Sequence, residues 1–114
     1  VSLGWVPPGA VVIGGGAVVS TSFNGTSPTV NIGFRNAGDG TTADPDDYAS
    51  ALALGTVGNI VADELATSTA YHPEGAEIAA AVSIGGSPSA GSGFVYVTFM
   101  VDNTLWRSRA PMMN

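Results

Sequence analysis

Carboxylates gather in one short stretch of the sequence and are the first candidates for chemistry. Four of the nine acidic residues, Asp39, Asp44, Asp46 and Asp47, fall within nine positions. Calcium prefers oxygen ligands of this kind, but an EF-hand loop needs acidic or amide residues at alternate positions and a glutamate at the twelfth. A helix start accounts for three of these residues. We therefore predict no metal site, with calcium binding as the alternative.

His72 is the only histidine, and it precedes a proline in an expected turn. A Ser-His-Asp arrangement would need a partner serine, and the chain has no Gly-x-Ser-x-Gly nucleophile elbow. Glu74 and Glu77 are spaced as an acid–base pair would be, but a solvated turn explains them more simply. We therefore predict no catalytic residues and no enzymatic activity.

Two glycine-containing segments resemble known sites, a phosphate-binding loop and a glycosylation site, but the surrounding residues do not support either. Gly14-Gly15-Gly16 resembles a phosphate loop, but the chain has no lysine, and strand-forming residues follow where a helix should start. We predict a bulge or bend in a strand there, and no cofactor. Asn24-Gly25 opens a glycosylation sequon but is also a strong hairpin signal, so we predict a hairpin turn.

The two tryptophans lie near opposite ends of the chain, outside the expected strands, and two arginines and two methionines accompany the C-terminal one. These residue types are enriched at protein interfaces. The alternatives are that the two tryptophans fold back onto the core, or that they form a stacking platform for a sugar. The predicted partner-binding residues are Trp5, Leu105, Trp106, Arg107, Arg109, Met112 and Met113.

Composition excludes several classes of protein. The 114 residues suit one domain. Only 11% of the residues are charged and the net charge is −6, with three arginines and no lysine, which argues against nucleic acid and anionic membranes as partners. The absence of cysteine excludes disulfides and thiolate metal sites. The start of the sequence lacks the features of a signal peptide, so we expect a soluble mature chain.

Sixteen glycines and seven prolines separate short runs rich in valine, isoleucine, threonine and phenylalanine, which indicates an all-β domain. We predict strands at 10–23, 29–34, 56–61, 66–71, 77–84 and 94–101. One short helix is expected near 45–54, because Asp44 can cap it, Pro45 suits its first position and Gly55 can end it. Strand 94–101 is apolar on both faces, so it lies within the domain or is covered by a partner.

Two stretches resemble small β-sandwich virion proteins of tailed bacteriophages. The first runs from Trp5-Val6-Pro7-Pro8-Gly9 through Thr21-Ser22-Phe23-Asn24-Gly25-Thr26 to Thr29-Val30-Asn31-Ile32-Gly33. The second joins the Asp-rich stretch, with Tyr48-Ala49-Ser50-Ala51, to the loop Gly85-Gly86-Ser87-Pro88-Ser89-Ala90-Gly91 before Phe94-Val95-Tyr96-Val97. Together they span about residues 5–101. They are patterns of strand and turn, and they contain no catalytic signature.

The resemblance implies a single β-sandwich of jelly-roll type and a non-enzymatic capsid decoration or cement protein. We expect an N-terminal arm (1–9), a β-sandwich domain (10–103) and a C-terminal tail (104–114). The implied partners are the major capsid protein and further copies of the chain, as a homotrimer or homodimer, at the capsid surface of a virion. A tail or head–tail connection protein and a carbohydrate-binding module using Trp5, Trp106 or Tyr96 are the alternatives.

Overall fold

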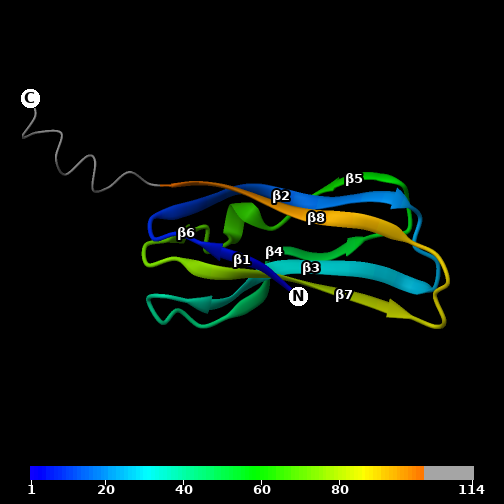
Figure 1. The fold of residues 1–114 in the computed structure, drawn as a ribbon, viewed down its shortest axis with the longest axis horizontal. Helices are drawn as coiled ribbons and strands as arrows, with labels where there is room; N and C mark the ends of the chain where they lie inside the picture. The colour runs from blue at the N-terminus through cyan, green and yellow to red at the C-terminus, as the bar shows by residue number, and fades with distance from the viewer. Residues whose placement is uncertain (102–114) are drawn as a thin grey trace, which may run out of the picture.

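The computed structural model describes residues 1–101, apart from the side chain of Ala66, and these residues form antiparallel β-strands joined by loops (Figure 1). The predicted all-β class is confirmed, while the jelly-roll type stays a prediction. No helix among the described residues is long and apolar enough to cross a membrane. The elements are β1 (Ser2–Val6), β2 (Ala10–Thr21), β3 (Thr26–Ala37), β4 (Asp44–Ala53), β5 (Gly58–Val61), the 3-10 turn η1 (Leu65–Thr67), β6 (Tyr71–His72), β7 (Ala76–Gly85) and β8 (Ser92–Val101).

The strands form two sheets. One has the order β1-β7-β3-β4, and the other is built around β2. β8 pairs with β2 over almost its whole length, while β5 and β6 pair with separate parts of β2. Because β2 residues such as Ala17 pair with both β5 and β8, these two strands lie on opposite sides of β2. Figure 1 shows β2 and β8 above β3 and β7.

The core lies between the sheets and takes its apolar side chains from both. Val30, Ile32 and Phe34 alternate along β3 and are fully buried, as their period-two spacing predicts. The same alternation on β2 buries Val12, and after a bulge it buries Ala17 and Val19. The two sheets therefore share one apolar core.

The predicted helix at 45–54 is wrong, because this segment forms β4, an edge strand paired with β3. The buried residues Tyr48 and Leu52 are four apart, which suits a helix face equally well. In the structure this spacing comes from an irregular strand with register shifts, in which Ala51 has a φ of 55°. The side-chain oxygen of Asn31 accepts a hydrogen bond from the Ala51 amide at 2.7 Å. A side chain of β3 thus stabilises a bulge that sequence spacing does not reveal.

The predicted hairpin at Asn24-Gly25 is also wrong. β2 and β3 belong to different sheets, so this segment crosses from one sheet to the other. The Asn24 side-chain oxygen accepts hydrogen bonds from the amides of Ser89 and Ala90, at 2.8 and 3.1 Å. These bonds tie the β2–β3 connection to the β7–β8 connection.

The remaining predicted segments are found with altered bounds. The run at 66–71 gives η1 and the two-residue β6 instead of one strand. The N-terminal segment 1–9, expected as an arm, contains β1, which pairs with β7 and forms an edge of its sheet. Strand 94–101 corresponds to β8, which pairs within the described residues only with β2. The tail at 104–114 lies outside the described residues.

Gly33 provides a test of the β3–β4 contact. A Cβ atom at this position would overlap the carbonyl oxygen of Asp44 and the backbone of Pro45. We predict that Gly33→Ala lowers the free energy of unfolding by about 1–3 kcal/mol, measured by urea denaturation. Gly55→Ala is the matched control, because a Cβ there meets nothing within 4 Å, and its effect should stay under about 0.5 kcal/mol. Equal stabilities of the two variants would contradict the close approach.

Candidate functional site

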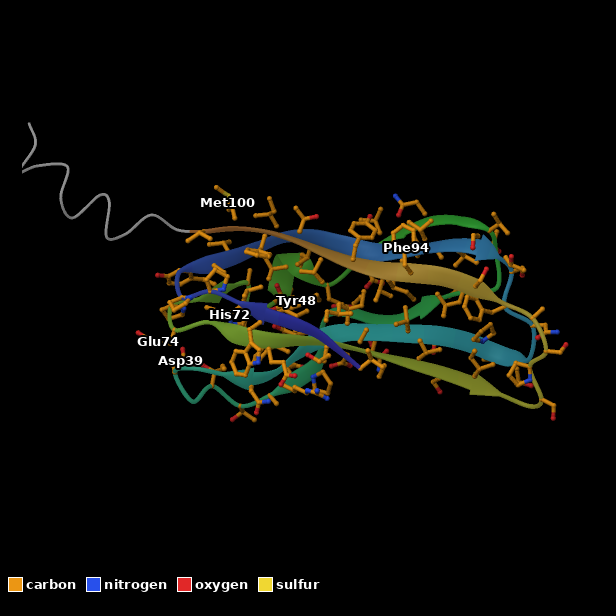
Figure 2. All side chains as sticks on the ribbon, in the orientation of Figure 1. Asp39, Tyr48, His72, Glu74, Phe94 and Met100 are labelled. Carbon is orange, nitrogen blue, oxygen red and sulfur yellow. The ribbon has the colours of Figure 1, made fainter. Side chains whose placement is uncertain are left out.

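His72, the only histidine, is buried in the core with 2% of its surface exposed. Its Nε2 atom is hydrogen-bonded to the hydroxyl of Tyr48, which also donates to the carbonyl of Thr69 at 3.3 Å. The Tyr48 hydroxyl has one proton, so both hydrogen bonds form together when His72 Nε2 donates to Tyr48 and Tyr48 donates to Thr69. The edge of the His72 ring meets Phe34 at a centroid distance of 4.9 Å. Figure 2 shows Tyr48 and His72 close together between the sheets.

The electrostatics of this pair suit a structural role. Burial lowers the pKa of His72 and raises the pKa of Tyr48, so both side chains are neutral at pH 7. Among residues 1–101 no serine is hydrogen-bonded to His72, and the ring has almost no access to solvent. The pair joins β4 to β6 across the two sheets, and we assign it to stability.

The acidic residues lie on β4 and in loops, not at a helix start. Asp44, Asp46 and Asp47 line a shallow polar depression with Glu64 of the segment before η1. A hydrogen bond with Asp46 raises the pKa of Asp44, while the Asp47 carboxylate accepts the amide of Thr69 at 2.8 Å. Among the described residues, no group of three or more ligands is arranged to hold a metal ion. These carboxylates are used in local hydrogen bonds.

Glu77, on β7, forms an ion pair with Arg35 of β3 in the same sheet as β4. Its carboxylate lies 2.9 Å from the Arg35 guanidinium and accepts a bond from the Asn36 side chain at 2.6 Å. The Arg35 hydrogen bond is the main cause that lowers the pKa of Glu77 to about 2. Glu74 lies in the loop between β6 and β7. Glu77 is thus bound to a cation and not free to act with Glu74 as an acid–base pair.

The sheet built around β2 has no charged residue on any of its strands. We call its outer surface the apolar face. It presents exposed Ile13, Val61, Phe94 and Met100, of which Figure 2 labels the last two along β8. Tyr96, half-buried between them, reaches across β2 and donates to the side-chain oxygen of Asn59 at 3.1 Å. Exposed apolar surface without charges is typical of an interaction site.

Gly14 and Gly16 make the middle of the apolar face flat. They pair with Thr98 and Tyr96, whose side chains lie on the outer surface. The glycine run is therefore part of a strand with a bulge, as the sequence predicts, and the register shift falls between Val12 and Gly14. A side chain at Gly16 would collide with the carbonyl of Ile60 on β5. The glycines allow neighbouring strands to approach and Tyr96 to lie across them.

A groove opens between the edge strands β8 and β1. It has two parts, with volumes of about 550 and 280 Å³, and Leu3 and Val95 line both. Trp5, 61% exposed on β1, and Phe99 on β8 line the smaller part. Figure 1 shows β1 below β8 in the view. Trp5 is therefore not folded into the core, and it borders the smaller part of the groove.

The predicted partner-binding residues are only partly placed by the structure. Trp5 lies at the groove, whereas Leu105, Trp106, Arg107, Arg109, Met112 and Met113 lie outside the described residues. Sequence reasoning identified only one strand of the apolar face, 94–101, as apolar on both sides. The signal for the whole face is the absence of any charged residue from 10–21, 58–61 and 92–101. That absence becomes meaningful only once the three segments are known to be neighbours.

The titration of His72 gives a testable pH dependence. Because the pKa of His72 is lowered from 6.5, the unfolded chain binds a proton before the folded one. The free energy of unfolding should fall below about pH 6.5, by up to about 1.4 kcal/mol per pH unit. We predict that His72→Gln removes this slope between pH 7 and 5 in urea denaturation series.

Glu77→Gln is the control for this experiment. The lowered pKa of Glu77 contributes stability that is lost only as the pH falls from about 4.5 towards 2. The Glu77 variant should therefore keep the slope between pH 7 and 5. A slope that survives in His72→Gln would show that other groups cause it.

No protein-family model matches the chain, and the comparisons with curated proteins and with solved structures found no match.

Proposed function

We propose that the protein is a non-enzymatic structural component of a tailed-phage virion, a capsid decoration protein that binds and stabilises the head shell. The apolar face is the observation that supports this proposal most directly. It is flat, carries no charge, and exposes Phe94 and Met100 by 63% and 57%. Such a surface suits contact with another protein, because burying it costs no charge desolvation.

The fold we propose for this role is a β-sandwich of jelly-roll type. Its support is the shared core, in which Val12 and Val19 of one sheet and Val30 and Ile32 of the other are buried together. A packed sandwich is rigid and can hold a flat binding face in one shape. Rigidity suits a protein that binds several capsid subunits, because a rigid surface loses little conformational entropy on binding.

The proposed partners are the major capsid protein and further copies of the chain, at the capsid surface. A homotrimer or homodimer placed on a symmetry axis would repeat the same contact with each capsid subunit. The acidic balance supports a protein partner over nucleic acid, since Arg35 is the only arginine or lysine among the described residues. The same balance gives no attraction to an anionic membrane.

A charge placed on the apolar face tests the proposal. We predict that Phe94→Asp and Met100→Asp each weaken binding to head shells, made from the major capsid protein of the same genome, at least about tenfold. Bound protein is measured by sedimentation with the shells. Val57→Asp is the matched control, because Val57 is equally exposed, at 58%, but lies in the loop before β5. Equal binding by all three variants would contradict a role of this face.

The alternative role, in the phage tail or the head–tail connection, differs from capsid decoration in the particle that the chain should bind. Cosedimentation with purified tails or connectors, and not with shells, would favour that alternative. Loss of this binding in Phe94→Asp would still place the contact on the apolar face.

A carbohydrate-binding module is the second candidate, and the placement of Tyr96 favours it. Aromatic platforms for sugars often occupy a sheet face, and Tyr96 lies on such a face beside exposed Phe94, while Trp5 is exposed at the groove. Glycan-array binding that is lost in Tyr96→Ala or Trp5→Ala would support this function. Shell binding without any glycan signal would oppose it.

A further inference from the structure

The outer edge of β8 has free main-chain groups at alternate residues. The carbonyl of Gly15 accepts a hydrogen bond from Ala62, so it points away from β8. Its partner on β8 is Val97, whose main-chain groups must then point away from β2. The amide of Val12 likewise donates away from β8, which frees its partner Phe99. Because the direction of these groups alternates along a strand, every second residue of β8 has a free amide and carbonyl.

The main-chain groups of β8 therefore divide into two sets. Those of Phe94, Tyr96 and Thr98 bond to β2, whereas those of the odd-numbered residues from Gly93 to Val101 point to the outer edge. Among residues 1–101, no strand pairs with this edge. An unpaired edge of this length is a template for another strand.

The other edge strands of the described fold are protected in ways that β8 is not. β4 carries Asp44, Asp46 and Asp47 and has register shifts. β1 has five residues and a register shift before Gly4, and β5 and β6 have only four and two residues. Charges, irregularities and short length all prevent edge-to-edge pairing. β8 has ten uncharged residues, which pair with β2 in unbroken succession.

The side of the domain that carries this edge is large enough for a stable interface. Nine residues of β8 are about 30 Å long, and two stacked sheets are about 20 Å deep. This side therefore presents about 600 Å² in each copy, or about 1,200 Å² in a pair, which is the size of a specific interface. The groove opens on the same side, where Trp5 and Phe99 are exposed. A strand added to β8 would cover it.

The sequence of β8 is complementary to itself in one antiparallel register. When Val97 lies opposite the partner's Val97, the two strands overlap over almost their whole length. Phe94 then lies opposite the partner's Met100, and Tyr96 opposite the partner's Thr98. Phe94 and Met100 are both exposed on the apolar face (Figure 2), and a thioether beside an aromatic ring is a favourable contact. A two-fold axis makes each of these pairs occur twice.

The same register joins the free main-chain groups of both edges. Val97 exchanges two hydrogen bonds with its counterpart, and Val95 exchanges two with the partner's Phe99, so the whole contact contains about ten. Val95 and Val97 pack towards the core, and Val95 lines both parts of the groove. The partner's Phe99 therefore lies beside the groove, and each copy covers the groove of the other.

We propose that two copies of the chain pair through β8, antiparallel about a two-fold axis at Val97, so that the sheet around β2 continues from one copy into the other. The occupant is a second copy because β8 is complementary to itself and brings no charge to the contact. In a chain of net charge −6, the acidic edge at β4 would instead repel a second copy. The apolar faces of the two copies then form one surface.

This inference rests on the self-association in the proposed function, and it names the surface and the number of copies. It is measured on the isolated protein, without head shells. Shell binding and pairing through β8 can therefore fail independently of each other.

Disulfides test the register, and the chain has no native cysteine to interfere. Tyr96 and the partner's Thr98 form a non-hydrogen-bonded pair with Cα atoms about 4.5 Å apart, which a disulfide can bridge. We predict that Tyr96→Cys and Thr98→Cys chains, mixed and then oxidised in air, form a disulfide-linked dimer that contains one of each. Each variant alone is the matched control, because identical residues lie about 7–8 Å apart on the diagonal and should cross-link at least about tenfold more slowly.

Each other outcome of the disulfide experiment overturns the proposal. Fast cross-linking of Tyr96→Cys alone, or of Thr98→Cys alone, would mean a register centred on that residue. Equal rates in all three samples would mean chance collision without a register. No cross-link in any sample would mean that β8 does not meet a second copy.

The mass of the full chain in solution gives a second readout. Sedimentation equilibrium should show a dimer, and Val97→Pro should raise its dissociation constant at least about tenfold, because proline removes an amide from the centre of the contact. This amide does not bond to β2, so the circular dichroism spectrum of the variant should stay that of the wild type. Ile13→Asp is the control and should leave the dimer unchanged, because Ile13 is exposed on the same face but lies on β2.

Two results of the mass measurement would refute the pairing. One is a dimer that Val97→Pro leaves as stable as the wild type, because the contact would then lie elsewhere. The other is a wild-type monomer. If the Val97 amide of that monomer were still slow to exchange with solvent, another segment of the same chain would cover the edge.

Discussion

The contact of Phe34, Tyr48 and His72 links three strands from both sheets, and the interior depends on it. Phe34 lies on β3 and Tyr48 on β4, while His72 comes from β6 beside β2. His72 is the only buried polar side chain in the described core, and its bond to Tyr48 lets it be buried as a neutral group. The chain has no cysteine, and one ion pair lies on the described surface, so the fold relies on the packing of a core that includes this contact.

The two sheets differ in charge, and this difference determines what each can contact. Arg35, Glu77 and three aspartates lie on strands of the sheet that contains β3 and β4. The strands of the sheet around β2 carry no charged residue. Gly14 and Gly16 add no side chains to the middle of its outer surface. The charged sheet is therefore costly to remove from water, while the apolar face can be buried against a partner without desolvating any charge. The groove at the β1–β8 side joins these two surfaces.

Strands with regular alternation were predictable from the sequence, and irregular ones were not. Val30, Ile32 and Phe34 alternate in the printed sequence and are buried in the structure. β4 was not predictable in this way. Its bulge at Ala51 brings Tyr48 and Leu52 into the core at a spacing of four residues, which also fits a helix. The bulge is stabilised by Asn31, twenty residues away, and such a contact is invisible in local sequence.

The candidate site was predictable in its chemistry but not in its position. Trp5 was identified as a contact residue, and the structure leaves it exposed beside a groove. The apolar face needs segments 10–21, 58–61 and 92–101 to lie side by side, which is a property of sheet order. No local pattern encodes that order, and so the full extent of the apolar face became visible only in the fold.

If the protein coats a particle as proposed, the separation of charge between its two sheets has a further consequence. When the uncharged sheet is covered by a partner, the sheet that carries Asp44, Asp46 and Asp47 faces the surrounding water. Every bound copy then adds negative charge to the outside of the particle. Coated particles would repel one another at low ionic strength and move faster towards the anode than bare ones. A protein that joins subunits within one particle would in this way also keep separate particles from aggregating.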